Sequence, residues 1–90
     1  MRRKRYAIAY DIADDRNRNK VAKTLEGYGK RVQYSVFECE LAPAELARLK
    51  KELAPHVDEE TDSVRFYLIH GKPETLEGRL NTPSPQGWIV

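Results

Sequence analysis

The chain has 90 residues, of which 40% are hydrophobic and 33% are charged, and its formal net charge is +2. This length predicts one domain with a modest core, spanning residues 1–90. We expect no association with a membrane, because no apolar run approaches the roughly 20 residues that span a bilayer, and no segment has the features of a signal peptide. The single cysteine, Cys39, excludes an internal disulfide framework and indicates a reducing cytoplasm.

Charge is distributed unevenly along the chain. Residues 1–31 contain ten Lys and Arg against four Asp and Glu, whereas residues 32–90 contain six against ten. A basic half of this kind is what a phosphate-binding surface needs. The skew is equally compatible with an ordinary solvated surface, so it does not by itself predict nucleic-acid binding.

The first third of the chain predicts a strand followed by a helix. Residues 5–12 form the strand, which a polar, charged turn terminates. The helix covers about 15–28, with Asp14 or Asp15 as its N-cap and Gly29 as its C-terminal stop. Its apolar stripe has the spacing i, i+4, i+7 and consists of Val21, Leu25 and Tyr28.

The middle of the chain predicts a second strand and a second helix. The strand spans about 31–41, a length that allows either one long strand with a bulge or two short strands joined by a tight turn. The helix begins at Pro43, a residue suited to the first helical turn, and ends at Pro55. Its expected buried stripe is Leu46, Leu49 and Leu53.

The last third predicts one clear strand and two weaker ones. After an acidic turn at 58–62, residues 63–69 form a strand rich in β-branched and aromatic side chains. A weak strand is expected near 74–80, and a short final strand at 87–90 follows a Pro-rich turn.

The strands at 5–12 and 63–69 are apolar on both faces. In the first strand the tyrosines and isoleucines point one way, and Ala7, Ala9 and Asp11 point the other. A sheet with helices on one side and water on the other should alternate more cleanly. We therefore expect a second copy of the chain to cover the helix-free face, in a symmetric homodimer.

Asp11 is the strongest candidate for a functional residue. It ends the first strand, and the cations Arg16, Arg18 and Lys20 follow it closely. A carboxylate at the end of a buried strand needs a partner, and a divalent ion held against a phosphate would supply one. Without further information, a strand-end aspartate is more often a turn or capping residue.

Four segments carry a resemblance to a known family: 9–15, 18–22, 29–38 with its Arg-Val-Gln-Tyr-Ser-Val-Phe-Glu run, and 58–68. In order and spacing they resemble the second universal CRISPR-associated protein, the small nuclease-like subunit of CRISPR adaptation. The resemblance implies an α+β, ferredoxin-like βαββαβ fold, and so two strands, or a bent pair, between Arg31 and Pro43 and in the regions flanking this segment. It also implies a face-to-face homodimer in which a fifth strand, about 80–90, joins the partner's sheet.

The resemblance further implies roles for individual residues. Asp11 matches the family's catalytic aspartate, which binds Mg²⁺ or Mn²⁺ and faces its copy across the dimer axis. Arg18 and Arg31 match arginines of the family, and Lys20 stands where many members have another arginine; with Arg16, they are expected to contact the nucleic-acid backbone. The possible cleft residues are Ser35, Phe37 and Tyr10, the last on a strand face that favours a core position.

Two functions follow from the resemblance. The first is a Mg²⁺-dependent endonuclease that hydrolyses single-stranded RNA, double-stranded DNA or both and takes part in spacer acquisition. The second is a non-catalytic dimeric adaptor that bridges CRISPR integrase dimers and binds protospacer DNA, which does not require Asp11. A ferredoxin-like RNA-binding module is disfavoured, because a dimer that buries its sheet face cannot stack bases on it. The sequence does not choose between RNA and DNA, since proteins contact the phosphates of both.

Overall fold

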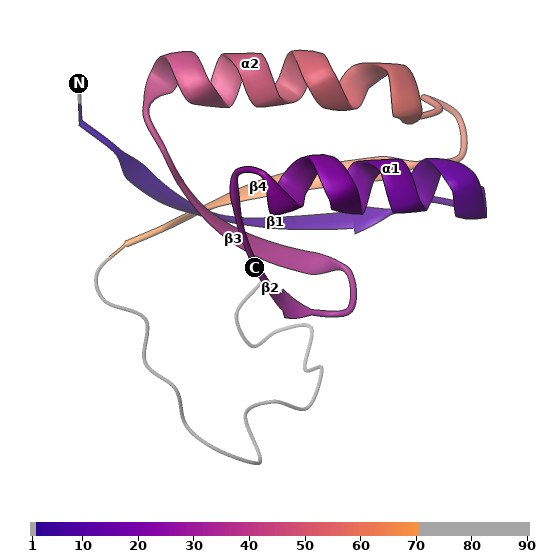
Figure 1. Ribbon diagram of the computed structural model, residues 1–90, viewed down its shortest axis with the longest axis horizontal. Coiled ribbons are helices and arrows are strands. Elements are labelled where there is room, and N and C mark those ends of the chain that lie inside the picture. The colour runs from indigo at the N-terminus through magenta and orange to yellow at the C-terminus, as the bar shows by residue number, and fades with distance from the viewer. Residues whose placement is uncertain (1, 71–90) are drawn as a thin grey trace.

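The computed structural model describes residues 2–70, which form one antiparallel sheet and two α-helices (Figure 1). In chain order the elements are β1 (Lys4–Asp11), α1 (Asp15–Glu26), β2 (Gly29–Gln33), β3 (Val36–Leu41), α2 (Pro43–Leu53), a 3₁₀ turn (Ala54–His56) and β4 (Ser63–Ile69). The spatial order of the strands is β2-β3-β1-β4. This confirms the α+β, βαββαβ prediction for the described part. The strands predicted near 74–80 and at 87–90 lie outside the described residues.

The region predicted as one long or two short strands is a hairpin. Gln33 pairs with Val36, so Tyr34 and Ser35 form a two-residue turn between β2 and β3. The register shifts between Arg31 and Gln33, which marks an irregularity in β2 just before the turn. The hairpin agrees with the family resemblance, whereas the local pattern alone left both arrangements open.

The end of α1 differs from the prediction. The helix stops at Glu26, and Gly27 caps it by donating its N–H to the Thr24 carbonyl at 3.1 Å. Gly29 is therefore not the helix stop but the first residue of β2. A Cβ on Gly29 would lie 2.2 Å from the Glu38 carbonyl oxygen and 2.5 Å from Cys39 Sγ, so the close approach of β2 to β3 requires glycine there.

The beginnings of the helices follow the expected capping chemistry. Asp14, not Asp15, is the N-cap of α1, and its carboxylate accepts a hydrogen bond from the Asn17 N–H at 2.9 Å. At the start of α2, Pro43 occupies the first turn as predicted, and the Glu45 carboxylate accepts from the Ala42 N–H at 2.8 Å. After Leu53 the chain continues through Pro55 as a 3₁₀ turn.

Both helices contribute to one core on the same face of the sheet (Figure 1). The predicted helical stripes are confirmed at their centres, while Tyr28 and Leu46 are only partly buried and pack at the margin of the core. The buried side chains of the two helices are Val21, Ala22, Leu25, Leu49 and Leu53, and those of the facing strands are Ile8, Tyr10, Phe37, Cys39 and Leu41. The opposite face of the sheet, which carries Ala9 and Asp11, has no helix of the described chain over it.

Neither helix of the described part is long and apolar enough to cross a bilayer.

Candidate active site

Asp11 lies exposed at the end of β1, on the face of the sheet that the helices leave open. Its partner in β4 is Ser63, the first residue of that strand. On its other side, the Tyr10 N–H donates to the Ser35 carbonyl at 3.1 Å, which joins the end of β1 to the β2–β3 turn. The end of β1, with Asp11, therefore lies between the start of β4 and the β2–β3 turn.

Asp62 holds the loop that follows Asp11. One carboxylate oxygen accepts from the Ala13 N–H at 2.9 Å, and the other accepts from the Asp58 N–H at 2.8 Å. The Thr61 hydroxyl donates to the same carboxylate at 3.0 Å. These bonds, led by the one from Ala13, lower the pKa of Asp62. The sequence predicted only an acidic turn here, because the partner amide lies 49 residues away.

Two of the predicted phosphate-binding arginines fix backbone carbonyls near Asp11. Arg18 Nη1 donates to the Ile12 carbonyl at 2.8 Å. Arg18 also pairs with Asp15, which is the main reason that its pKa is raised. Arg31 Nη1 donates to the Tyr34 carbonyl at 2.9 Å, so this arginine of β2 holds the turn that follows its own strand. Both guanidinium groups are thus positioned by the backbone rather than free to move.

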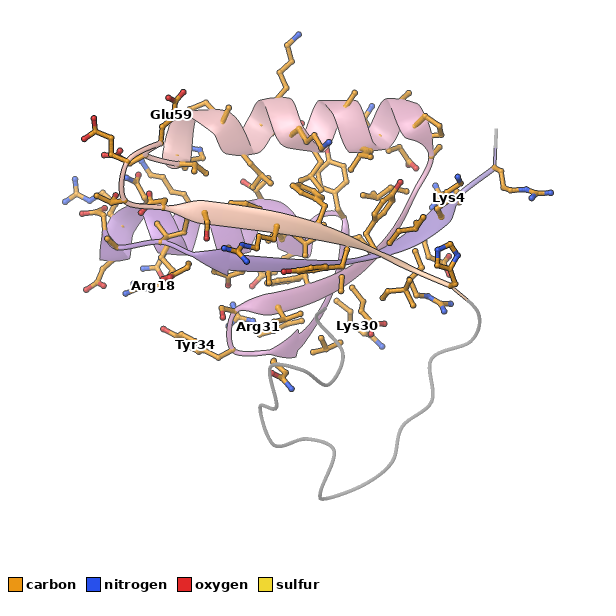
Figure 2. All side chains as sticks on the ribbon, turned by 180° about the vertical axis from the view of Figure 1, so that it is seen from behind. Lys4, Arg18, Lys30, Arg31, Tyr34 and Glu59 are labelled. Atoms are coloured by element: carbon orange, nitrogen blue, oxygen red, sulfur yellow. The ribbon has the colours of Figure 1, made fainter. Side chains whose placement is uncertain are left out.

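Arg18, Arg31 and Tyr34, which Figure 2 labels, form together with Tyr10 what we call the tyrosine–arginine cluster. The Tyr10 hydroxyl donates to the Tyr34 carbonyl at 3.4 Å. Burial raises the pKa of Tyr10, and the positive charge of Arg31 only partly opposes this. The phenol therefore stays protonated at neutral pH and remains a donor to the turn.

The possible cleft residues occupy different environments. Phe37 is fully buried and Tyr10 is 5% exposed, with their ring centroids 6.2 Å apart. The Arg31 guanidinium lies over the Phe37 ring, 5.2 Å from its centroid. Ser35 is half-buried in the β2–β3 turn. Within one chain, Tyr10 and Phe37 support the turn from the core side, and Ser35 offers the more accessible surface.

The remaining predicted cations do not join the cluster. Arg16 and Lys20 are exposed and are spaced i, i+4, so they share one side of α1. Arg18 lies between them in sequence but about 200° around the helix from Arg16. The structure therefore divides the candidates into a positioned pair, Arg18 and Arg31, and an exposed pair, Arg16 and Lys20.

A metal ion would find few ligands in a single chain. Among residues 2–70, no three His, Cys, Asp or Glu side chains gather in a group that could hold a metal ion. Mg²⁺ does not need such a group, because it keeps several waters and commonly binds one or two carboxylates plus a phosphate. Cys39 is unsuited as a ligand, since burial raises the pKa of its thiol to about 11. Asp11 alone thus fits Mg²⁺ if phosphate or a second copy completes the site.

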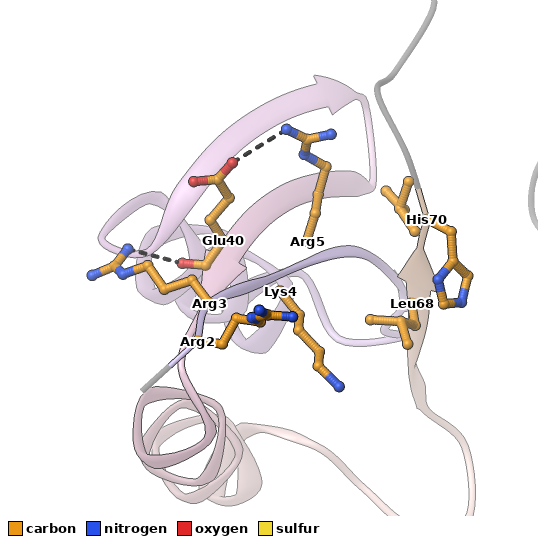
Figure 3. A pocket seen from close by; sticks show the side chains of 8 residues that line it. Arg2, Arg3, Lys4, Arg5, Glu40, Leu68 and His70 are labelled. Atoms are coloured by element: carbon orange, nitrogen blue, oxygen red, sulfur yellow. Dashed lines mark hydrogen bonds and ion pairs between the residues drawn. The ribbon is translucent and has the colours of Figure 1, made fainter.

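The other end of β1 carries a second group of charges (Figure 3). A cavity of about 440 Å³ opens there, lined by Arg2, Arg3, Lys4, Arg5, Glu40, Leu68, Ile69 and His70. Arg3 pairs with Glu45 at 3.0 Å, and Arg5 pairs with Glu40 at 3.2 Å. A strand of this length places the cavity roughly 23 Å from Asp11. The cavity and the acidic residue are therefore separate features.

Comparisons with known proteins converge on one family. The model of the family described as CRISPR associated protein Cas2 matches residues 4–74. A relative from Synechocystis sp., named CRISPR-associated endoribonuclease Cas2 3, is 56% identical over 88 residues, which cover 94% of this chain and 96% of the relative.

Solved structures agree with this match. The crystal structure of Streptococcus pyogenes Cas2 at pH 6.5 has a TM-score of 0.72 and 40% identity, over 80% of this chain and 98% of that one. A chain of a partial Cas6-RT-Cas1–Cas2 complex has a TM-score of 0.66 and 33% identity, over 74% of this chain and 79% of that one.

Proposed function

Because this chain belongs to the Cas2 family of CRISPR-associated proteins, we propose that it is an endonuclease with Asp11 as its catalytic carboxylate. The observation that carries the proposal is the position of Asp11, exposed on the open sheet face and bordered by loops that side chains hold in place. The relative at 56% identity is named an endoribonuclease, which supports RNA as a substrate. Double-stranded DNA stays an alternative substrate, because both backbones present the same phosphodiester.

We propose Mg²⁺, with Mn²⁺ as a substitute, as the cofactor held by Asp11. When bound, the ion would lower the pKa of a water molecule and polarise the phosphoryl oxygen. Asp11 is exposed at the end of β1, opposite Ser63 of β4, so its carboxylate is accessible to an ion. The role of Asp11 is to hold the ion in position, and the bonds of Asp62 to the loop keep the backbone after Asp11 in place.

A homodimer would complete the site. The open face of the sheet has apolar side chains at its centre, among them Ala9, Tyr67 and Ile69, each partly accessible in the single chain. Packing two such faces would remove this apolar surface from water and would bring two copies of Asp11 across the symmetry axis. Two close carboxylates repel unless a proton or a cation lies between them, which favours metal binding. We also propose that the segment 80–90 is the strand that reaches the partner.

The arginines of the cluster would hold the substrate phosphate. A guanidinium has five N–H donors, and the backbone bonds of Arg18 and Arg31 use only some of them. The remaining donors can contact phosphate oxygens without a large loss of side-chain freedom. Arg16 and Lys20 would attract the strand through longer-range electrostatics.

An adaptor role in spacer acquisition can accompany this activity. The chain of the partial Cas6-RT-Cas1–Cas2 complex supports a CRISPR integrase subunit as a partner. Such a role depends on the outer surfaces of a dimer and leaves Asp11 unused. The single buried cysteine supports a cytoplasmic site for both activities.

The test compares Asp11→Asn with wild type on single-stranded RNA and duplex DNA, with Mg²⁺ and with EDTA. Asn keeps the shape of the side chain but loses its charge, so cleavage should fall below detection while dimerisation and nucleic-acid binding persist. Glu59→Gln is the matched control, because it removes one negative charge from an exposed turn. Full cleavage by purified Asp11→Asn would overturn the catalytic assignment. Absence of cleavage by wild type, with retained binding to the integrase subunit, would favour the adaptor alone.

A further inference from the structure

Tyr34 is unusually exposed for an aromatic residue. Tyr34 is 73% exposed to solvent. The other large hydrophobic residues exposed among residues 2–70 are Val32, at 44%, and Leu68, at 43%. Tyr34 occupies the first position of the two-residue turn between β2 and β3, where hairpins favour Gly, Asn or Asp. Neither burial nor turn chemistry therefore accounts for an aromatic side chain at this position.

The backbone beneath the Tyr34 ring is firmly held. Its carbonyl accepts from Arg31 Nη1 at 2.9 Å and from the Tyr10 hydroxyl at 3.4 Å. The adjacent Ser35 carbonyl accepts from the Tyr10 N–H at 3.1 Å. Tyr10 is buried in the core, so these bonds tie the turn to the core of the protein. An exposed ring on a fixed turn can bind a partner with little loss of backbone freedom.

Two arginines lie close to Tyr34. Figure 2 shows Tyr34 beside Arg18 and Arg31 at one end of the sheet. The pKa of Arg18 is raised mainly by its bond to Asp15 and, to a smaller extent, by the side chain of Tyr34, which places the two side chains within interaction range. An accessible aromatic ring close to cations is the arrangement with which proteins bind unpaired nucleotides, stacking on the base and pairing with the phosphates.

We propose that Tyr34 is a nucleobase-stacking residue that positions an unpaired nucleotide beside Asp11. The inference rests on the proposed function and adds a contact to the base, which neither Asp11 nor the arginines supply. Bases within a duplex already stack on their neighbours and expose no free face to the ring. The contact therefore favours single-stranded nucleic acid over duplex.

The test measures binding rather than cleavage, in full-length chains that also carry Asp11→Asn so that the probe stays intact. Fluorescence anisotropy compares three probes of equal length: a single-stranded oligoribonucleotide, the same sugar–phosphate chain without bases, and a duplex. Tyr34→Ala should weaken binding of the base-containing single strand about fivefold to a hundredfold. It should change binding of the abasic strand and of the duplex less than about twofold. Tyr34→Phe, which keeps the ring, should bind all three as the parent does.

Each other outcome contradicts the proposal in a recognisable way. An equal loss on base-containing and abasic strands would mean that Tyr34 acts only by positioning Arg18 and Arg31. A loss in Tyr34→Phe as large as in Tyr34→Ala would assign the effect to the hydroxyl. Weaker dimerisation of Tyr34→Ala in sedimentation would assign the ring to the interface between copies. Because none of these readouts depends on cleavage, failure of the nuclease proposal would appear separately, as cleavage that survives Asp11→Asn.

Discussion

The two ends of β1 both carry many charged side chains, but these side chains make different contacts. Near Asp11, the charged side chains bond to the backbone: Arg18 to the Ile12 carbonyl, Arg31 to the Tyr34 carbonyl, and Asp62 to two N–H groups. Near Lys4, one charged side chain also bonds to the backbone, from Arg3 to the Glu40 carbonyl at 3.2 Å, but most contacts join one charged side chain to another. There, Arg3 pairs with Glu45 and Arg5 pairs with Glu40, on surfaces that water reaches.

The difference is that charged side chains fix the loops around Asp11, whereas those around Lys4 mainly pair with carboxylates. A charged group bonded to a backbone carbonyl or amide fixes the path of a loop. Arg18 and Arg31 do this although each also pairs with a carboxylate, Arg18 with Asp15 and Arg31 with Glu26. An exposed ion pair that holds no backbone group contributes only about 0.2–1 kcal/mol. The number of basic residues in the first half of the chain does not distinguish the two ends of β1. The contacts of these residues favour the Asp11 end as the binding surface.

The largest expected effect comes from Gly29→Ala, which would disturb the strand that carries Arg31 to the Asp11 end. The new Cβ would overlap the Glu38 carbonyl and Cys39 Sγ, so β2 must move away from β3 at a cost of about 3 kcal/mol. Urea unfolding should show this loss. Gly27→Ala is the matched control, because its Cβ would meet only the Thr24 carbonyl, at 3.4 Å. Equal stability of the two variants would contradict the tight β2–β3 contact.

A smaller effect, dependent on pH, is expected from Asp62→Asn. The folded-state pKa of Asp62 lies below its ordinary value of 3.8, so its contribution to stability is present above that value and is lost as the pH falls through the folded-state pKa. At neutral pH the variant should melt a few degrees below wild type, and the gap should narrow below about pH 4.

Thermal unfolding followed between pH 3 and pH 7 checks this expectation for Asp62. Glu59→Gln, in the same acidic turn, serves as the control and should track wild type across the range. A melting-temperature gap between Asp62→Asn and wild type that stays constant down to pH 3 would show that the carboxylate does not hold the loop through its charge.

The smallest effects are expected from substitutions of Arg18 and Arg3, which compare one arginine from each end of β1. Arg18→Ala should reduce the slope of log affinity against log salt by about one, because one phosphate contact is lost. Arg3→Ala should leave that slope unchanged and cost less than about 1 kcal/mol of stability, since its ion pair is exposed. Salt titrations of nucleic-acid binding for the two variants measure this directly. Equal slopes would mean that both ends of β1 contact the strand.

Much of the local structure follows from the sequence itself. The strand predicted at 63–69 is β4 residue for residue, and the helical stripes locate the buried faces of α1 and α2. Periodicity succeeds here because burial repeats within a single element, every second residue in a strand and every third or fourth in a helix. The face of β1 on which Asp11 lies follows from the same alternation, and the charged turn after it marks the end of the strand.

The tertiary structure decided the features that join distant segments. Gly29, predicted as the stop of a helix, lies in β2, where pairing with β3 leaves no room for a side chain. Pairing of β1 with β4 brought Asp62 to the Ala13 amide. It also placed Tyr34 next to Arg18, although no local pattern links them. Local patterns report only whether a residue faces the core, whereas a hydrogen bond or a steric contact depends on which strands become neighbours. The sequence alone therefore predicted the elements and the catalytic candidate, and the sheet pairing determined what surrounds it.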